Sequence, residues 1–192
     1  VLEGLLINFV QKYYYNNVEV ILTNQIKLSA DFYSRYFSNS SLEDNVLDNL
    51  DIFWKQTPAQ VQIIDLSGKV LMDSIGVISK KPIDSNDFIK AAHGNKGTWI
   101  GKVDYSKSNV MAVTYPLKAD DKTVGVLRFI TSLEEANKDI RNVSLIFILI
   151  GIIVILISGT VSLFIADTII DPIKEVTDVA EKMASGNLAV RS

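Results

Sequence analysis

The chain lacks cysteine and contains a single histidine, His93. Disulfide frameworks, thiolate zinc sites, iron–sulfur clusters and cysteine nucleophiles are therefore excluded, and no cluster of histidines can hold a metal. Basic residues are not in excess either, because 19 Lys and Arg face 22 Asp and Glu. Proteins that track nucleic-acid phosphates need a basic surface, so this balance argues against a nucleic-acid partner.

One segment lacks charge altogether. Residues 143–166 run for 24 positions without a charged side chain, and 18 of them are Ala, Val, Ile, Leu or Phe. A helix of that length measures about 36 Å, which is enough to cross a hydrocarbon core of roughly 30 Å. We therefore predict a transmembrane helix over residues 142–166, and the lipid bilayer is the first expected partner.

The N-terminus is also apolar. Residues 1–10 read VLEGLLINFV, and the three tyrosines at 13–15 are typical of the aromatic belt at a membrane surface. We interpret residues 1–15 as the remnant of a first transmembrane helix. A soluble amphipathic helix is the alternative.

The rest of the N-terminal half favours helices. No proline or glycine occurs between Leu5 and Phe37, and apolar residues recur there at helical spacing, so one long helix is predicted. Ser41 is placed to cap a second amphipathic helix that ends near Thr57.

The middle of the chain has the alternation and turn residues of strands. The predicted strands cover residues 61–65, 69–73, 98–103, 110–117 and 124–131, and Ser85 is predicted to cap a short helix over residues 86–92. Five strands with a long helix on one face predict an α+β domain with an antiparallel sheet.

The last strand leads directly toward the membrane. Ser132 stands three residues before Glu135, which is the spacing of a capping box, and no proline follows until Pro172. The helix that starts here is therefore predicted to continue into the bilayer. Because a shift of the sheet would move that helix, Ser132 and Glu135 are candidate signal-transmission residues.

A second helical pattern follows the membrane segment. Pro172 suits a first helical position, the apolar residues at 169, 173, 176, 180 and 183 form a coiled-coil seam, and Gly186 ends the pattern. The segment DPIKEVTDVAEKMASGNL, residues 171–188, resembles the first helix of a HAMP linker. The resemblance implies that residues 167–192 are cytoplasmic and pair within a homodimer, with Pro172 and Gly186 as signal-transmission residues.

Two further segments resemble a sensor family. VQIIDLSGKVLMDS (residues 61–74) and VGVLRFITSLEEANKDI (residues 124–140) are similar to the extracytoplasmic PAS-like, or Cache, sensor domains of bacterial histidine kinases. The resemblance implies a sensor domain over residues 16–141 outside the bacterial cell membrane, followed by the transmembrane helix and the HAMP linker.

By that likeness the chain is the sensory and signal-transmission part of a two-component sensor histidine kinase. Three alternatives remain open: the input part of a methyl-accepting chemoreceptor, that of a membrane diguanylate cyclase, and a protein-interaction or dimerisation module that binds no small molecule.

The sequence shows no glycine-rich phosphate loop and no Ser/His/Asp arrangement that spacing supports, so no catalytic residue, metal or cofactor is assigned to it. ATP and Mg are expected only for a kinase core beyond these residues, with a cytoplasmic response regulator as its partner. His93, next to Gly94, suits a helix C-terminus.

Arg128 is the first candidate for ligand binding, because a charge inside an apolar strand needs a partner or solvent. We expect its guanidinium to bind a carboxylate or another anion in a pocket under the sheet, with Trp99, Tyr115 and Asp73 around it. Alternation places Arg128 on the same face as Val124, Val126 and Ile130. The alternative is an ion pair with Asp73 or Asp104 that only holds the sheet.

Overall fold

The computed structural model describes residues 2–37, 39, 41–44, 57–79, 81–170, 173, 176 and 177. The chain divides into two compact units, Val1–Arg141 and Asn142–Ser192. The first unit contains α1 (Leu2–Tyr36), β1 (Gln60–Ile64), β2 (Val70–Asp73), α4 (Asn86–Ala92), β3 (Gly97–Gly101), β4 (Val110–Ala119) and β5 (Lys122–Ser132). Helix α5 (Glu134–Ile165) begins in the first unit and continues into the second, where a π-helical turn, Ala166–Ile170, follows it.

The five strands form one antiparallel sheet in the order β2-β1-β5-β4-β3. Two tight turns set this arrangement. Gly68 has φ +87° between β1 and β2, and Asp120 and Asp121 have φ values of 48° and 61° between β4 and β5. Asp120 and Asp121 form a two-residue loop, in which backbone with positive φ matches the twist of the paired strands, while Gly68 supplies a positive φ in the longer connection between β1 and β2. The predicted antiparallel α+β domain is confirmed, and its first two strands form a hairpin.

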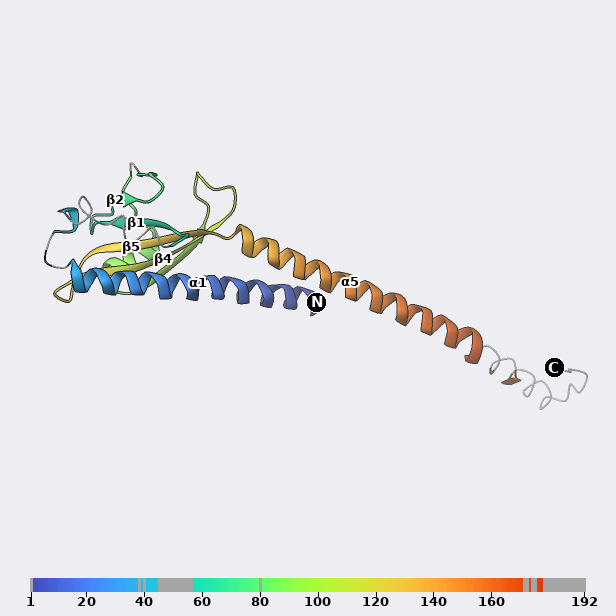
Figure 1. Cartoon of the computed structure of the whole chain (residues 1–192). Coiled ribbons are helices and arrows are strands. Elements are labelled where there is room, and N and C mark those ends of the chain that lie inside the picture. Colours follow the sequence, from blue (N-terminus) through green and yellow to red (C-terminus); the bar gives the residue numbers. More distant parts are fainter. Residues whose placement is uncertain are drawn as a thin grey trace, which may run out of the picture. The chain divides into compact units, whose positions relative to one another are not determined.

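Helix α1 lies along one face of the sheet, beside β4 and β5 (Figure 1). Its helical spacing places Leu22, Ile26, Ala30 and Tyr33 against the strands, all of them buried. With the inward residues of the strands they form the largest cluster of the described core, which we call the α1-face core. Its buried members are Leu22, Ile26, Ala30, Tyr33, Leu42, Ala59, Val61, Ile63, Met111, Val113, Leu117, Leu127, Phe129 and Leu133.

The opposite face of the sheet is covered in part by α4. The apolar residues of this face of the sheet fall into two smaller clusters, one around Ile64 and Val126 and one around Ala112 and Ile130. Gly97 allows the close approach of α4, because a Cβ there would lie 2.6 Å from both the Asp87 Cα and the Thr114 Oγ1. Ser85 precedes α4 as predicted, but its side chain makes no capping hydrogen bond.

The bulge in β5 corrects one prediction. The register shifts between Leu117 and Lys118, so that Gly125 pairs with Leu117 while Thr123 pairs with Lys118. Val124 is the extra residue, and it packs against the α1-face core. The prediction that Val124 shares a face with Arg128 was therefore wrong, because simple alternation fails at a bulge.

The second unit is dominated by α5. The segment Glu134–Thr168 has a mean hydropathy of 2.8 in its most apolar window and is long enough to cross a membrane, the one such helix among the described residues. Its apolar side chains, such as Leu145, Ile155 and Leu163, are exposed. Most of the predicted HAMP helix, including Pro172 and Gly186, lies outside the described residues, as does most of the helix predicted after Ser41. The interpretation of residues 1–15 stays a prediction.

Candidate functional site

A row of polar side chains crosses the face of the sheet that α1 does not cover. Asp73 of β2 pairs with Gln62 of β1, Gln62 with Arg128 of β5, and Arg128 with Thr114 of β4. Residues in register on adjacent strands point to the same face, so these four side chains lie side by side. We call them the polar row.

The charge of Arg128 is neutralised by Asp87 of α4. Its Nε donates to the Asp87 Oδ2 at 3.0 Å, and the exposed fractions of the two side chains are 9% and 0%. The guanidinium also lies 5.5 Å from the ring centroid of Trp99, a cation–π geometry. Thr114 donates from Oγ1 to the main-chain oxygen of Asp87 at 2.8 Å, which fixes α4 against the sheet.

Several acceptors in this buried region have no hydrogen-bond partner among the described residues. They are the Asp87 Oδ1, the Gln62 Oε1 and the Ser85 Oγ, a hydroxyl that can also donate. Buried polar atoms are normally paired with protein, ordered water or a ligand. Each of these three atoms can therefore accept a hydrogen bond that the described residues do not supply.

Gln60 connects the polar row with a neighbouring cleft. Its Nε2 donates to the Asp73 Oδ2 at 2.8 Å, and its Oε1 accepts from the Tyr105 hydroxyl at 2.8 Å. Gln62 donates to the same Asp73 oxygen at 2.7 Å. Burial raises the pKa of Tyr105 and the nearby Asp73 carboxylate adds to the rise, so the phenol stays protonated and acts as a donor at neutral pH.

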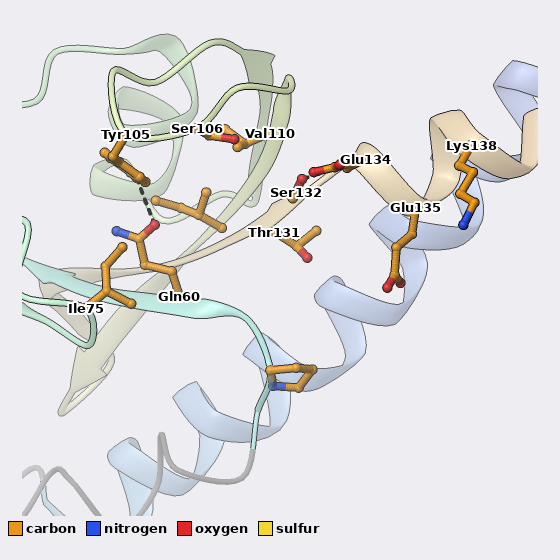
Figure 2. A pocket seen from close by; sticks show the side chains of 12 residues that line it. Gln60, Ile75, Tyr105, Ser106, Val110, Thr131, Ser132, Glu134, Glu135 and Lys138 are labelled. Carbon is orange, nitrogen blue, oxygen red and sulfur yellow. Dashed lines mark hydrogen bonds between the residues drawn. The ribbon is translucent and has the colours of Figure 1, made fainter. Parts of the chain in front are cut away.

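The cleft has a volume of about 660 Å³ and is open to solvent. Figure 2 shows Gln60, Tyr105 and Val110 on one side of it and side chains from the first turns of α5 on the other. The lining residues are Pro58, Gln60, Ile75, Tyr105, Ser106, Val110, Ile130, Thr131, Ser132, Glu134, Glu135 and Lys138. This volume lies within the range of ligand sites for small molecules.

Ser132 and Glu135, the predicted signal-transmission residues, both line the cleft. Ser132 accepts a hydrogen bond on Oγ from the Glu134 N–H at 3.1 Å. A capping box requires the Ser132 Oγ to accept from the Glu135 N–H, so this bond is not part of the predicted box. No hydrogen bond from Ser132 N–H to the Glu135 carboxylate occurs among the described residues.

The structure separates the other predicted ligand residues. Trp99 contacts Arg128 and Asp73 lies in the same row, but Tyr115 packs against the α1-face core on the opposite face. The prediction that Tyr115 lines a cavity with Arg128 was wrong. Trp99 pairs with Ala112, and Tyr115 follows Ala112 by three positions, an odd spacing that reverses the face.

The alternative predicted for Arg128 needs a different partner. The ion pair that holds Arg128 is formed with Asp87, not with Asp73 or Asp104. Asp87 stands in the first turn of α4, where acidic residues are common because they interact with the helix dipole. Its position therefore gave no reason to expect a contact with the sheet. Gln60, Gln62 and Tyr105 were also missed, because the sequence carries no signal that brings these three to one site.

No protein-family model matches the chain, and no curated protein matches its sequence. Solved structures do match. The ligand-binding domain of the Campylobacter jejuni chemoreceptor Tlp3 in complex with L-norvaline is similar with a TM-score of 0.53 at 16% identity, covering 72% of this chain and 59% of that one. The same domain with L-valine gives a TM-score of 0.52 at 16% identity, with coverage of 72% and 60%.

The chain shares the fold of these sensor domains. It spans less than two thirds of their length. Taken with the strand order and the long helix on one face, this similarity confirms the PAS-like/Cache fold expected from the sequence.

Proposed function

We propose that this chain is the sensory and signal-transmission part of a bacterial membrane-bound sensor. Its first unit binds a small molecule outside the cell membrane, and α5 carries the response through the bilayer as a homodimer. The sensor-domain fold supports the first part, and the one candidate transmembrane helix of the described chain supports the second.

One observation carries the proposal. The cleft is lined by the sheet and the connection between β3 and β4 on one side and by the first turns of α5 on the other. A molecule that contacts both sides binds the sensor and the membrane helix at once. Its differential affinity for two positions of α5 is the energy that shifts the signal.

The Tlp3 ligands suggest the first probes. The similar Tlp3 domain is solved with L-norvaline and with L-valine, so free amino acids are tested first, followed by small carboxylic acids. The full chain in lipid nanodiscs should unfold at a higher temperature when a ligand is bound. At a ligand concentration of a hundred times the Kd, binding raises the free energy of unfolding by about 2.7 kcal/mol.

The matched variants locate the binding. Tyr105→Phe and Gln60→Ala should weaken the stabilisation, because both side chains line the cleft. Tyr13→Phe removes a hydroxyl from an exposed ring on α1 and should leave it unchanged. A ligand whose effect survives both cleft variants binds elsewhere, and the absence of any stabilising compound supports the protein-interaction module instead.

The histidine-kinase output is the finer part of the proposal. The HAMP-like segment 171–188 supports a cytoplasmic linker but is shared by kinases, chemoreceptors and membrane cyclases. The coding sequence after Ser192 distinguishes them. A helical pair with a phosphorylatable histidine and an ATP-binding domain supports the kinase and its response regulator, while a long heptad array or a cyclase domain contradicts it.

A further inference from the structure

The start of α5 is held to the first unit by one side of the helix. Leu133, just before α5, is fully buried in the α1-face core, and its N–H donates to the Asn109 oxygen at 2.9 Å. Ala136, one turn later, is 8% exposed. Asn137 lies next to it on the same side of the helix and is half-buried.

Asn137 makes a hydrogen bond to the other long helix. The Tyr15 hydroxyl of α1 donates to the Asn137 Oδ1 at 2.8 Å, across 122 positions of sequence. The Tyr15 ring packs against the α1-face core, so its hydroxyl has a fixed position. We call this pair the clasp.

The opposite side of α5 faces the cleft. Glu134, Glu135 and Lys138 line the cleft, and at 100° per residue they project away from Leu133, Ala136 and Asn137. Glu135 and Lys138 extend from the same side of the first turns in Figure 2. The first two turns of α5 are therefore held on one side by α1 and are open to a ligand on the other.

A hydrogen bond of this kind constrains the rotation of a helix. A hydroxyl–oxygen hydrogen bond has a length of about 2.5–3.0 Å, weakens steeply at angles below about 120°, and is absent at about 3.6 Å. Rotation of α5 by one residue position, or translation by a fraction of a turn, moves the Asn137 oxygen beyond that range. The clasp therefore distinguishes one position of α5 from its neighbours.

We propose that Tyr15 and Asn137 are positioning residues that set the rotation of α5 against α1. A ligand in the cleft then changes the signal by favouring a rotation of α5 in which the hydrogen bond between Tyr15 and Asn137 is broken. The role in signalling rests on the proposed sensor function, but the clasp itself can be tested without a ligand.

The first test measures amide hydrogen exchange in the full chain, reconstituted in phosphatidylcholine nanodiscs. Tyr15→Phe and Asn137→Leu each remove one half of the clasp and should speed exchange at residues 137–141 about two- to tenfold, the range of one hydrogen bond. The double variant should exchange no faster than the more affected single variant, because the two changes remove the same bond.

A conservative variant and a matched control identify the role. Asn137→Asp keeps an acceptor oxygen for the Tyr15 hydroxyl and should restore exchange to within about twofold of the wild type. Tyr13→Phe, a change of the same type on an exposed ring two positions away, should have no effect. The amides of β4 and β5 should keep their protection in every variant.

The second test uses the lack of cysteine in the chain. Cysteines placed at the exposed positions Asn17 and Asp139 are then the only sites for spin labels. The distance distribution between the labels should broaden or shift in Tyr15→Phe and not in Tyr13→Phe.

Unchanged exchange and an unchanged distance distribution in both Tyr15→Phe and Asn137→Leu would overturn the clasp. A loss of protection that extends through β4 and β5 would overturn it as well, because the bond would then support the whole fold rather than position α5. Neither measurement uses a ligand, so a failure to find a cleft ligand counts against the proposed function alone.

Discussion

The two faces of the sheet are built on different principles. The face under α1 is continuous and apolar, with Ile26, Leu127 and Phe129 all within 1% of full burial. The other face interrupts its apolar clusters with the polar row and the buried Asp87. Strand β5 contributes to both, since Leu127 and Phe129 point to one face and Arg128 between them to the other.

This difference separates stability from recognition. Apolar burial contributes to folding wherever shape is matched, so the α1-face core can stabilise the domain without specific polar geometry. A buried charge is costly unless it is paired, and its net contribution to stability is small even then. The polar face therefore depends on a few hydrogen bonds, which leaves it sensitive to a ligand that offers others.

The largest expected loss of stability comes from removing the ion pair of the polar face. Asp87→Ala leaves the Arg128 guanidinium buried without a counter-charge, and we expect the free energy of unfolding to fall by about 3–5 kcal/mol. Urea denaturation of the chain in detergent micelles, followed by circular dichroism, measures this loss.

Two further variants test the cause of that loss. Asp84→Ala, an exposed carboxylate just before α4, should change stability by less than about 0.5 kcal/mol. The double variant Asp87→Leu/Arg128→Met replaces the pair with apolar groups and should recover most of the stability. If the double variant is as unstable as Asp87→Ala, the ion pair is not what distinguishes this face.

The α1-face core should respond to volume instead. Leu127→Ala removes a fully buried side chain and is expected to cost about 2–5 kcal/mol, while Leu127→Met nearly conserves volume and should cost less than about 1.5 kcal/mol. The same denaturation experiment compares them. Equal losses for the two variants would show that this face is not governed by packing.

Much of the first face could be predicted from the sequence. The unbroken helical spacing of α1, the alternation in the strands and the turn at Gly68 are local signals, and the structure confirms all three. The turn at Asp120 and Asp121 is exposed. These features depend on residues near one another in the chain, so periodicity and turn chemistry determine them.

The polar face was harder to predict. The partner of Arg128 comes from α4, 41 positions away, and no periodicity relates the two. The bulge at Val124 breaks alternation, and the face of Tyr115 follows from a register that only the paired strands define. Side-chain pairs between distant elements depend on packing, which a single sequence does not encode locally.

A smaller loss of stability is expected at Gly97, where α4 approaches the sheet closely. In Gly97→Ala the added methyl would meet the backbone of Asp87 and the Thr114 hydroxyl, and we expect a loss of about 1–3 kcal/mol because α4 must move off the sheet. Gly4→Ala is the control. It has nothing within 4 Å of the added Cβ and lies in α1, so it should be neutral or stabilising by up to about 1 kcal/mol. A harmless Gly97→Ala would mean that the contact of α4 with the polar row is loose.

The smallest effect belongs to the solvent edge of the α1 face. Glu19 of α1 accepts hydrogen bonds from Lys96 at 2.6 Å and Thr98 at 2.8 Å, and the Lys96 ammonium lowers the pKa of Glu19 below its usual 4.5. Because the carboxylate is stabilised in the folded state, its contribution to the free energy of unfolding is present above about pH 4.5 and is lost as the pH falls through the lowered pKa.

Glu19→Gln should lower the free energy of unfolding by about 0.2–1 kcal/mol at pH 7, since both partners are partly exposed and screened. The difference between wild type and variant should shrink below pH 4.5 and in high salt. A loss that does not change with pH would mean that Glu19 acts by packing, as the rest of the α1 face does, and not by charge.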